Sequence, residues 1–321
     1  MRVIRDNPGR QLLRPSVVTI GNFDGFHLGH QALIRLCESL AGDERPIAVV
    51  TFEPLPQAWF NPQGAPARLM SVRQKLDYLA CQAIDLVWLM RFNQALAARE
   101  ADSFVQSVLV ETLSAQDVVV GEDFRYGRAR QGDIETLRLS GERLGFRLHT
   151  VPMLDVGKCR ASSSIIRDCL AAGDLDKAKQ LLGRPFSMTG RVIRGRQLGR
   201  RLGYPTANIR VTATPCPLLG VFVIRARWGD SDWHDGVANL GTRPAVGGDG
   251  VLLEVHLFDF TGSLYGQKME VEFIKKLRDE AHFEVIDDLV VQMREDERQA
   301  RVCLAPNVKL KSEKRTDKHG L

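Results

Sequence analysis

Short apolar runs alternate with helix-like stretches through the first half of the chain. The runs are continuous and rich in Val, Ile and Leu, as expected of strands buried on both faces: Ser16–Ile20, Ile47–Phe52, Leu86–Met90, Asp117–Val120 and Phe146–Val151. The other stretches have helical periodicity: Gly29–Ala41, Ser71–Ala83 with Ser71 as N-cap, Ala101–Leu113, Asp133–Leu144, Ser163–Ala172 and Leu175–Leu182. This alternation predicts an α/β, Rossmann-like domain whose parallel sheet binds ligands at the carboxyl ends of its strands.

The pattern changes after Gly183-Arg184-Pro185, because β-rich runs then follow one another without intervening helices: Ser187–Arg194, Gly220–Trp228, His234–Leu240, Leu252–Phe258 and Lys268–Phe273. Such spacing predicts a small antiparallel β-barrel or sandwich. A C-terminal helix is expected over Glu284–Val302, with Ile286, Leu289, Val290 and Met293 facing the barrel. We therefore predict an α/β domain over residues 1–183, a β-barrel domain with its helix over 184–306, and a disordered basic tail over 307–321.

Composition places the chain among soluble globular proteins. Its 321 residues fit two domains, and 44% hydrophobic with 26% charged residues is an ordinary balance. There is no apolar core of a signal peptide, and no run approaches the ~18 apolar residues of a membrane span. We therefore expect a cytoplasmic protein without a membrane partner.

The net charge of +5 does not by itself indicate a nucleic-acid partner. The tail holds five Lys and Arg residues against two acidic ones, which leaves only about +2 for the rest of the chain. The six cysteines contain no Cys-x-x-Cys pair, which argues against a zinc knuckle or a dithiol redox site. We expect reduced, mostly buried thiols.

The segment Gly21-Asn22-Phe23-Asp24-Gly25-Phe26-His27-Leu28-Gly29-His30 joins a predicted strand to a predicted helix. Glycines let backbone N–H groups approach an anion, and the first helical turn adds unpaired donors. Spaced three apart, His27 and His30 can direct two imidazoles at one phosphate. His-x-Gly-His is the pattern of nucleotidyltransferases, in which the imidazoles stabilise charge developing on the α-phosphate of ATP. An ordinary surface turn is the alternative, and the position between strand and helix favours catalysis.

A second segment, Gly195–Asn208, is rich in glycine and arginine and ends in Pro205-Thr206-Ala207-Asn208. Its glycines permit close approach to phosphates, and the oxygens of Thr206 and Asn208 are suited to Mg²⁺. Downstream, strand alternation places Glu254 on the face opposite its aliphatic neighbours, where it could act as a general base toward a substrate hydroxyl. On pattern alone, a mobile basic hairpin and a solvent-facing glutamate remain open.

Together, these motifs resemble the bifunctional bacterial riboflavin kinase/FAD synthetase family over residues 16 to about 303. Further matching segments are Thr51–Pro54, Gly121–Gly127, Arg160–Ser164 with Arg167, Gly236–Pro244, Leu253–Leu257, Leu264–Gly266 and Leu277–Glu280. The resemblance implies phosphorylation of riboflavin to FMN by the barrel half and adenylylation of FMN to FAD, with release of pyrophosphate, by the α/β half. It also implies ATP as co-substrate, Mg²⁺ as cofactor, small molecules as partners, and downstream flavoenzymes as recipients of the product.

The resemblance also implies roles for particular residues. His27 and His30 would be catalytic in adenylylation, and the ATP-binding residues there would be Gly21, Phe23, Gly29, Arg160, Ser163 and Arg167. The flavin-binding residues would be Asp123, Phe124 and Arg125, together with Arg278 in the barrel half. In the kinase, Gly199, Thr206 and Asn208 would bind ATP, with Thr206 and Asn208 also ligating the metal and Glu254 acting as the base.

Four positions depart from the residues usual in that family: Phe26, Leu55, Ser164 and Ala245. None removes a proposed phosphate ligand or base, and Ala245 bears on a kinase-site contact. Two other interpretations stay open: a single nucleotidyltransferase with a silent β accessory domain, and a flavin- or RNA-binding regulator without catalysis. The intact histidines, Thr206, Asn208 and Glu254 argue against the regulator.

Overall fold

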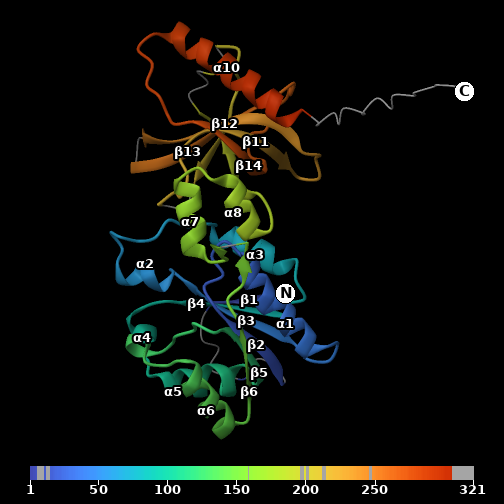
Figure 1. The fold of residues 1–321 in the computed structure, drawn as a ribbon, viewed down its shortest axis with the longest axis vertical. Helices are drawn as coiled ribbons and strands as arrows, with labels where there is room; N and C mark the ends of the chain where they lie inside the picture. The colour runs from blue at the N-terminus through green and yellow to red at the C-terminus, as the bar shows by residue number, and fades with distance from the viewer. Residues whose placement is uncertain are drawn as a thin grey trace, which may run out of the picture.

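The computed structural model describes residues 1–5, 11, 15–157, 159–195, 199, 202–211, 215–245 and 248–305, with side chains at 243–250 excepted. An α/β domain and a β-barrel lie one above the other along the long axis, with two helices between them (Figure 1). The predicted tail over residues 307–321 lies outside the described residues.

The first domain contains the predicted parallel sheet. Its strands are β1 (Arg2–Ile4), β2 (Ser16–Ile20), β3 (Ile47–Glu53), β4 (Leu86–Arg91), β5 (Ala115–Gly121) and β6 (Arg147–Val151). They are all parallel, in the order β1-β4-β3-β2-β5-β6. From β2 the chain first builds outward through β3 and β4, and then returns to add β5 and β6 on the other side. This reversal between β2 and β5 opens a crevice at the carboxyl ends of the strands.

Helices cover the sheet and connect its strands. They are α1 (Leu28–Ala41), α2 (Pro56–Phe60), α3 (Val72–Ala80), α4 (Gln94–Ala97), α5 (Ala101–Phe104), the π-helix η1 (Val105–Thr112), the 3₁₀ turn η2 (Arg128–Arg130), α6 (Ile134–Leu144), α7 (Ser163–Ala171) and α8 (Leu175–Leu182). A short hairpin of β7 (Asp155–Val156) and β8 (Cys159–Arg160) precedes α7. Successive residues of β2 and β3 pack in different apolar clusters. Val18 and Val50 share one cluster with Leu109, and Val17 and Val49 share another with Ile34.

Ser71 is confirmed as the N-cap of α3. Its hydroxyl accepts the Gln74 N–H, and the Gln74 side chain accepts the Ser71 N–H in return. The sequence pattern missed β1, α2 and α4, because segments of three to five residues are too short to show a period. The helix predicted over Ala101–Leu113 is correctly placed, but most of it is π-helical.

The second domain is a closed antiparallel barrel. Its strands are β9 (Phe186–Ile193), β10 (Ala207–Val211), β11 (Gly220–Trp228), β12 (His234–Ala245), β13 (Gly248–Leu257) and β14 (Lys268–Arg278), in the order β10-β13-β12-β11-β14-β9. Phe222, Leu253 and Phe273 are among its buried side chains. The sequence analysis missed β10, because Asn208 and Arg210 interrupt its apolar pattern.

The C-terminal helix α10 (Ile286–Leu304) lies across the barrel at the end away from the α/β sheet (Figure 1). Its predicted apolar face is wrong for Ile286, which is 59% exposed because the first turn projects beyond the barrel wall. Ala300 is instead the buried contact, clustered with Val223 and Phe258 of the barrel. A bidentate ion pair from Arg278 to the buried Asp296 fixes the middle of the helix.

The two domains share an apolar cluster. Leu175, Leu181 and Leu182 of α8 belong to the same cluster of buried residues as Phe186 and Phe273 of the barrel. Polar contacts also cross: Gln74 Nε2 donates to the carbonyl of Ser187 at 3.1 Å, and Lys268 pairs with Asp77 at 2.7 Å. The two domains are therefore joined by packing and hydrogen bonds.

Within the part of the chain that the structure describes, no helix is long and apolar enough to cross a membrane. The six cysteines are free thiols, as expected, but only Cys37 and Cys169 are buried. The expectation of mostly buried thiols was therefore wrong, because Cys81 and Cys303 lie on exposed helix ends and Cys159 and Cys216 are half-buried.

A buried charge lies on β5. The carboxylate of Asp117 is fully buried and accepts hydrogen bonds from Arg45, from Arg147 at 2.9 Å and from His149 at 2.7 Å. Burial alone would raise the pKa of this carboxyl, but these three hydrogen bonds outweigh burial and lower its pKa to about 2. Asp117 is therefore an ion-pair centre of the sheet.

We predict that Asp117→Asn lowers the free energy of unfolding at pH 7 by about 3 kcal/mol, because the neutral amide loses the charge whose interactions with Arg45, Arg147 and His149 lower the native pKa to about 2. An unfolded Asp titrates near 3.9, so the stability contributed by the ionised native carboxylate should be complete above about pH 5 and disappear as the pH falls toward 2. Urea unfolding followed by circular dichroism at several pH values measures the difference between the two proteins. A difference that stayed constant down to pH 2 would contradict this assignment.

Candidate active sites

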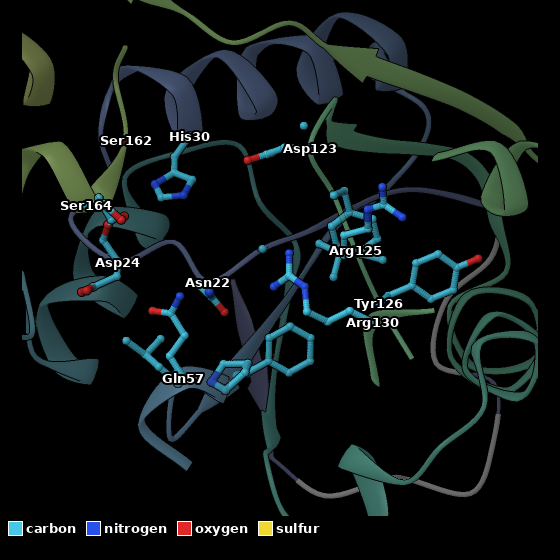
Figure 2. A pocket seen from close by; sticks show the side chains of 18 of the residues that line it. Asn22, Asp24, His30, Gln57, Asp123, Arg125, Tyr126, Arg130, Ser162 and Ser164 are labelled. Atoms are coloured by element: carbon cyan, nitrogen blue, oxygen red, sulfur yellow. The ribbon is translucent and has the colours of Figure 1, made fainter. Parts of the chain in front are cut away.

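An open cleft of about 960 Å³ lies at the carboxyl ends of the parallel strands. Its walls come from the segments that follow β2, β3, β4, β5 and β6, together with the start of α7. Figure 2 shows side chains from several of these segments around a common space, including Asn22, His30, Asp123 and Arg130. The cleft therefore coincides with the crevice that the strand order produces.

His27 and His30 lie together in the cleft wall. His27 is the N-cap of α1 rather than part of its first turn, and its Nδ1 accepts the backbone N–H of His30 at 3.4 Å. The two rings are stacked, with centroids 3.7 Å apart. Since Nδ1 of the neutral His27 ring is an acceptor, its Nε2 carries the proton and is a donor.

Both imidazoles are held neutral. Burial and, after it, the positive charges of Arg184, Arg160 and Arg167 lower the pKa of His27 to about 4, against the opposing effect of the nearby Asp123. The pKa of His30 is also well below the usual value, because of burial and then of the nearby His27, Lys75 and Arg184. Nδ1 of His30 is buried without a hydrogen-bond partner among the described residues. The pair is suited to bind a ligand through neutral N–H and N groups.

Asp24 connects the loop after β2 to α7. Its buried carboxylate pairs with Arg167 at 2.6 Å and accepts the N–H of Leu69, while its carbonyl accepts the Ser163 hydroxyl at 2.8 Å. Across the cleft, Arg160 pairs with Asp123 at 2.6 Å, and both of these side chains are exposed. Two guanidinium groups and a hydroxyl thus lie close to the histidines.

Most of the sequence-predicted residues of the first domain line this cleft: Gly21, His27, Gly29, His30, Asp123, Phe124, Arg125, Arg160, Ser163 and Arg167. Phe23 does not line it. Its side chain is fully buried in the core, and its ring lies 5.0 Å from that of His30, centroid to centroid. Of the departures, Leu55 and Ser164 line the cleft, whereas Phe26 is buried against Tyr78.

The sequence analysis missed Lys75, which is 97% buried beneath the loop after β2. Its Nζ donates to the carbonyl of Asn22 at 2.7 Å and to the hydroxyl of Thr51 at 3.3 Å. Burial lowers the pKa of Lys75 to about 8, although Asp24 and Glu53 oppose that effect. A lysine on an amphipathic helix is ordinarily exposed, so only its spacing against Leu76 and Leu79 could have raised suspicion.

An aromatic group on the other side of the cleft was also missed. Phe60, which is 63% exposed, packs edge-on against Phe92 at 5.7 Å, and Phe92 does the same against Phe52 at 6.0 Å. All three line the cleft, and so do the stacked rings of Phe124 and Tyr126. These rings come from β3, from α2 and from the segments that follow β4 and β5, so their spacing in the sequence carries no common signal. They provide flat apolar surface for a planar ligand.

A second cluster of predicted residues lies on the barrel. On neighbouring strands, Asn208 of β10 and Asn239 of β12 are each in register with Glu254 of β13. Pro205, just before β10, is held by a hydrogen bond of 2.9 Å from His256 Nδ1 to its carbonyl. Asn208, Glu254 and Asn239 therefore form one row across three strands.

The loop before β10 is only partly described, since residues 196–198, 200 and 201 lie outside. At Gly199 an added Cβ would lie 2.3 Å from the carbonyl oxygen of Tyr204, and the Gly199 carbonyl accepts the Tyr204 N–H at 2.7 Å. Only glycine permits this approach.

The donor atoms at this place fit a hard cation. Thr206 contributes a hydroxyl, and the Asn208 amide nitrogen donates to the Thr206 carbonyl, so that Oδ1 is the acceptor end of the amide. Among the described residues, no group of three or more His, Cys, Asp or Glu side chains is placed to hold a metal ion. A cation here would rely on the oxygens of Thr206 and Asn208 and on oxygens of a bound phosphate, and Mg²⁺ prefers oxygen ligands, including those of substrate phosphates.

Arg278 lies at the end of β14, away from the cleft of the first domain. Its guanidinium is engaged by Asp296 of α10 and lies over the ring of Phe283 at 5.9 Å. Its predicted flavin contact is untested.

Two sequence families match consecutive parts of the chain. FAD synthetase matches residues 10–165, and riboflavin kinase matches residues 182–304. Proteins named bifunctional riboflavin kinase/FMN adenylyltransferase are 41% identical in Haemophilus influenzae and 42% identical in Pseudomonas fluorescens. These alignments cover 92% and 96% of this chain, and 97% and 99% of those relatives. The chain belongs to the bifunctional riboflavin kinase/FMN adenylyltransferase family.

A solved structure supports the same arrangement of domains. A crystal structure described as a macrolide-efflux protein from Streptococcus pneumoniae matches this chain with a TM-score of 0.81 and 28% identity. The match covers 93% of this chain and 98% of that one. The riboflavin kinase/FMN adenylyltransferase family therefore accounts for both domains, and its two halves correspond to the two clusters of candidate residues.

We predict that His27 titrates near pH 4 in the ligand-free protein, far below the usual value of about 6.5. The proton would have to enter a buried site that already faces three arginines. NMR titration of the imidazole signals measures the midpoint, with His27→Gln providing the assignment. An imidazole that titrated near 6.5 would show that the ring is not held neutral in this way.

Proposed function

We propose that the chain carries out two ATP-dependent transfers at separate sites. The barrel phosphorylates riboflavin to FMN, and the α/β domain adenylylates FMN to FAD with release of pyrophosphate. The observation that carries this proposal is the pair of stacked, neutral imidazoles in the cleft of the α/β domain, together with the Asn208–Glu254–Asn239 row on a different domain. Membership of the bifunctional family supports both activities. We place the protein in the cytoplasm.

In the α/β domain, ATP binds with its phosphates beside His27 and His30. An oxygen of the FMN phosphate attacks the α-phosphorus, and pyrophosphate leaves with the electrons of the broken bond. Nε2–H of His27 donates toward the charge that develops on the phosphoryl oxygens, and the N-terminus of α1 adds backbone donors. A Cβ at Gly21 would lie 3.1 Å from the Phe23 ring, and one at Gly29 would lie 3.1 Å from the His27 ring. Both glycines therefore preserve the positions of the rings, and Phe23 acts indirectly by supporting the His30 ring from the core.

The other phosphate oxygens interact with Arg160, Ser163 and Arg167. Arg160 is exposed and pairs with Asp123, so phosphate oxygens compete with that carboxylate for the guanidinium fork. Arg167 keeps its ion pair with Asp24, and its positive charge favours binding of the phosphates. The Ser163 hydroxyl, at the start of α7, donates its one proton to the Asp24 carbonyl and turns from that carbonyl to donate to a phosphate oxygen.

The flavin of FMN lies among the aromatic rings of the same cleft. Phe124 and Arg125 approach it from the loop after β5, with Asp123 near the transferred phosphate. Phe60 and Phe92 form the opposite wall, and because their planes are inclined by 67°, one ring stacks on the isoalloxazine system while the other meets it edge-on.

In the barrel, Glu254 takes the proton from the ribityl hydroxyl of riboflavin as that oxygen attacks the γ-phosphorus, and ADP leaves. Gly199 lets the backbone approach the phosphates, and Arg278 closes the flavin end of the site. Thr206 and Asn208 hold Mg²⁺, which when bound neutralises phosphate charge. The FAD product passes to downstream flavoenzymes.

We predict that His27→Ala reduces formation of FAD from FMN and ATP by at least about 100-fold, because it removes a donor to the developing charge. Formation of FMN from riboflavin by the same protein should stay within about twofold of wild type. Chromatography of both products from each reaction gives the two rates. Equal loss of both activities in a folded variant would argue against separate sites.

The reverse pattern is expected for Glu254→Gln. Riboflavin phosphorylation should fall by about 100- to 10,000-fold, since the amide cannot accept the hydroxyl proton, while added FMN is still converted to FAD. Glu272→Gln on β14 is a matched control for loss of a strand carboxylate in the same barrel. Kinase turnover near that of wild type in Glu254→Gln would mean that another group is the base.

A further inference from the structure

Arg184 leaves the interdomain connection and reaches back into the adenylylation domain. It follows Gly183, the left-handed C-cap of α8, and comes two residues before β9 of the barrel. It also falls within the part of the chain that matches the riboflavin kinase family. Yet its guanidinium donates to the carbonyls of Gly25 at 2.8 Å and Phe26 at 3.1 Å, which immediately precede His27.

The contacts of Arg184 fix its orientation. Its guanidinium carbon lies 4.1 Å from the centroid of the Tyr78 ring on α3, a cation–π geometry, and Nη1 also donates to the carbonyl of Leu182 at 3.2 Å. The side chain therefore connects α3, the end of α8 and the loop after β2. The planar guanidinium group can donate several hydrogen bonds while its face lies over the Tyr78 ring, whereas the ammonium group of a lysine cannot.

The loop that Arg184 holds is conformationally strained. Gly25 has φ of 84° and Phe26 has φ of 43°, a left-handed conformation that is unfavourable for a bulky side chain. Gln31 also donates to the Phe26 carbonyl at 3.1 Å, so this carbonyl receives two hydrogen bonds. Such a conformation persists only when its surroundings impose it, and Arg184 supplies part of that constraint immediately before the catalytic imidazole.

Arg184 also contributes charge to the same place. Among the positive charges that lower the pKa of His27, Arg184 has the largest effect, followed by Arg160 and Arg167, while Asp123 raises that pKa. Arg184 also lowers the pKa of His30, together with Lys75. These are the charged groups that face the two imidazoles. A guanidinium behind the loop thus favours the neutral ring without occupying the cleft.

We propose that Arg184 is a positioning residue for adenylyl transfer, contributed by the segment that begins the kinase half. By holding the carbonyls of Gly25 and Phe26, it aims His27 at the phosphates, so that the adenylylation site is completed from beyond its own domain. This inference rests on the proposed adenylylation of FMN. It goes beyond that proposal, because Arg184 does not line the cleft.

The test compares Arg184→Ala and Arg184→Lys with wild type in the full-length protein. Arg184→Ala should lower kcat for FAD formation by about 10- to 100-fold, the size expected when a reacting group is misplaced by about 1 Å. KM for ATP should change much less, because the groups that contact ATP remain, and riboflavin phosphorylation should stay within about twofold. Arg184→Lys keeps the charge but loses the fork, so its kcat should also fall while His27 still titrates near pH 4.

Arg227→Ala is the matched control, since Arg227 pairs with Glu270 and lies over the Trp233 ring at 4.4 Å, and both of these partners belong to the barrel. It should leave FAD formation unchanged. In Arg184→Ala the His27 titration midpoint should rise above 4 but stay well below 6.5, because burial, Arg160 and Arg167 still lower it, whereas a loosened or unfolded site would bring it to about 6.5.

Wild-type kcat for FAD formation in folded Arg184→Ala, or an equal loss of both activities, would overturn the proposal. If Arg184→Ala does not fold, Arg184→Lys replaces it, and either of the same two outcomes in that variant would overturn the proposal. Absence of FAD formation by the wild-type protein would instead refute the proposed function itself.

Discussion

The buried ion pair between Asp24 and Arg167 is the interaction on which the α/β site depends. The two residues are 143 positions apart, and their pairing joins the loop after β2 to α7. Both side chains are largely withdrawn from water, so removing either partner would leave a buried charge, at a cost of about 3 to 5 kcal/mol. The same carboxylate accepts the Leu69 N–H, which brings the segment after β3 to the same point. The loop after β2, which carries the histidines, is thereby held by α7 and by the segment after β3 before any ligand binds.

This arrangement makes neutral histidines compatible with an anionic substrate. The cationic charge resides on Arg160, Arg167, Lys75 and Arg184, which surround the imidazoles, whereas the rings supply directional hydrogen bonds. Protonating either imidazole would add a positive charge to a site that already faces these cations. Because the neutral rings are already oriented, the phosphates meet fixed dipoles that need no reorganisation during transfer.

Much of the fold followed from periodicity in the sequence. Continuous apolar runs separated by helical patterns predicted the parallel sheet, and the loss of helices after Gly183 predicted the barrel, because both signals are local. The motif residues of the first half converge on one cleft, as strand–turn–helix placement implied. Lys75, the aromatic wall of Phe60 and Phe92, and Arg184 could not be predicted, since their importance comes from contacts between distant segments. The apolar face of α10 was misplaced for a similar reason: the barrel's shape decides where the helix touches it.

The apolar cluster shared by α8 and the barrel has a consequence for how such a protein can be divided. Leu175, Leu181 and Leu182 are buried in a cluster that includes barrel residues on β9 and β14. A polypeptide ending at the last turn of α8 would present part of this leucine surface to water, where it favours self-association. A stand-alone version of either half would need polar replacements along this seam. Packing, as well as chemistry, therefore joins the two halves.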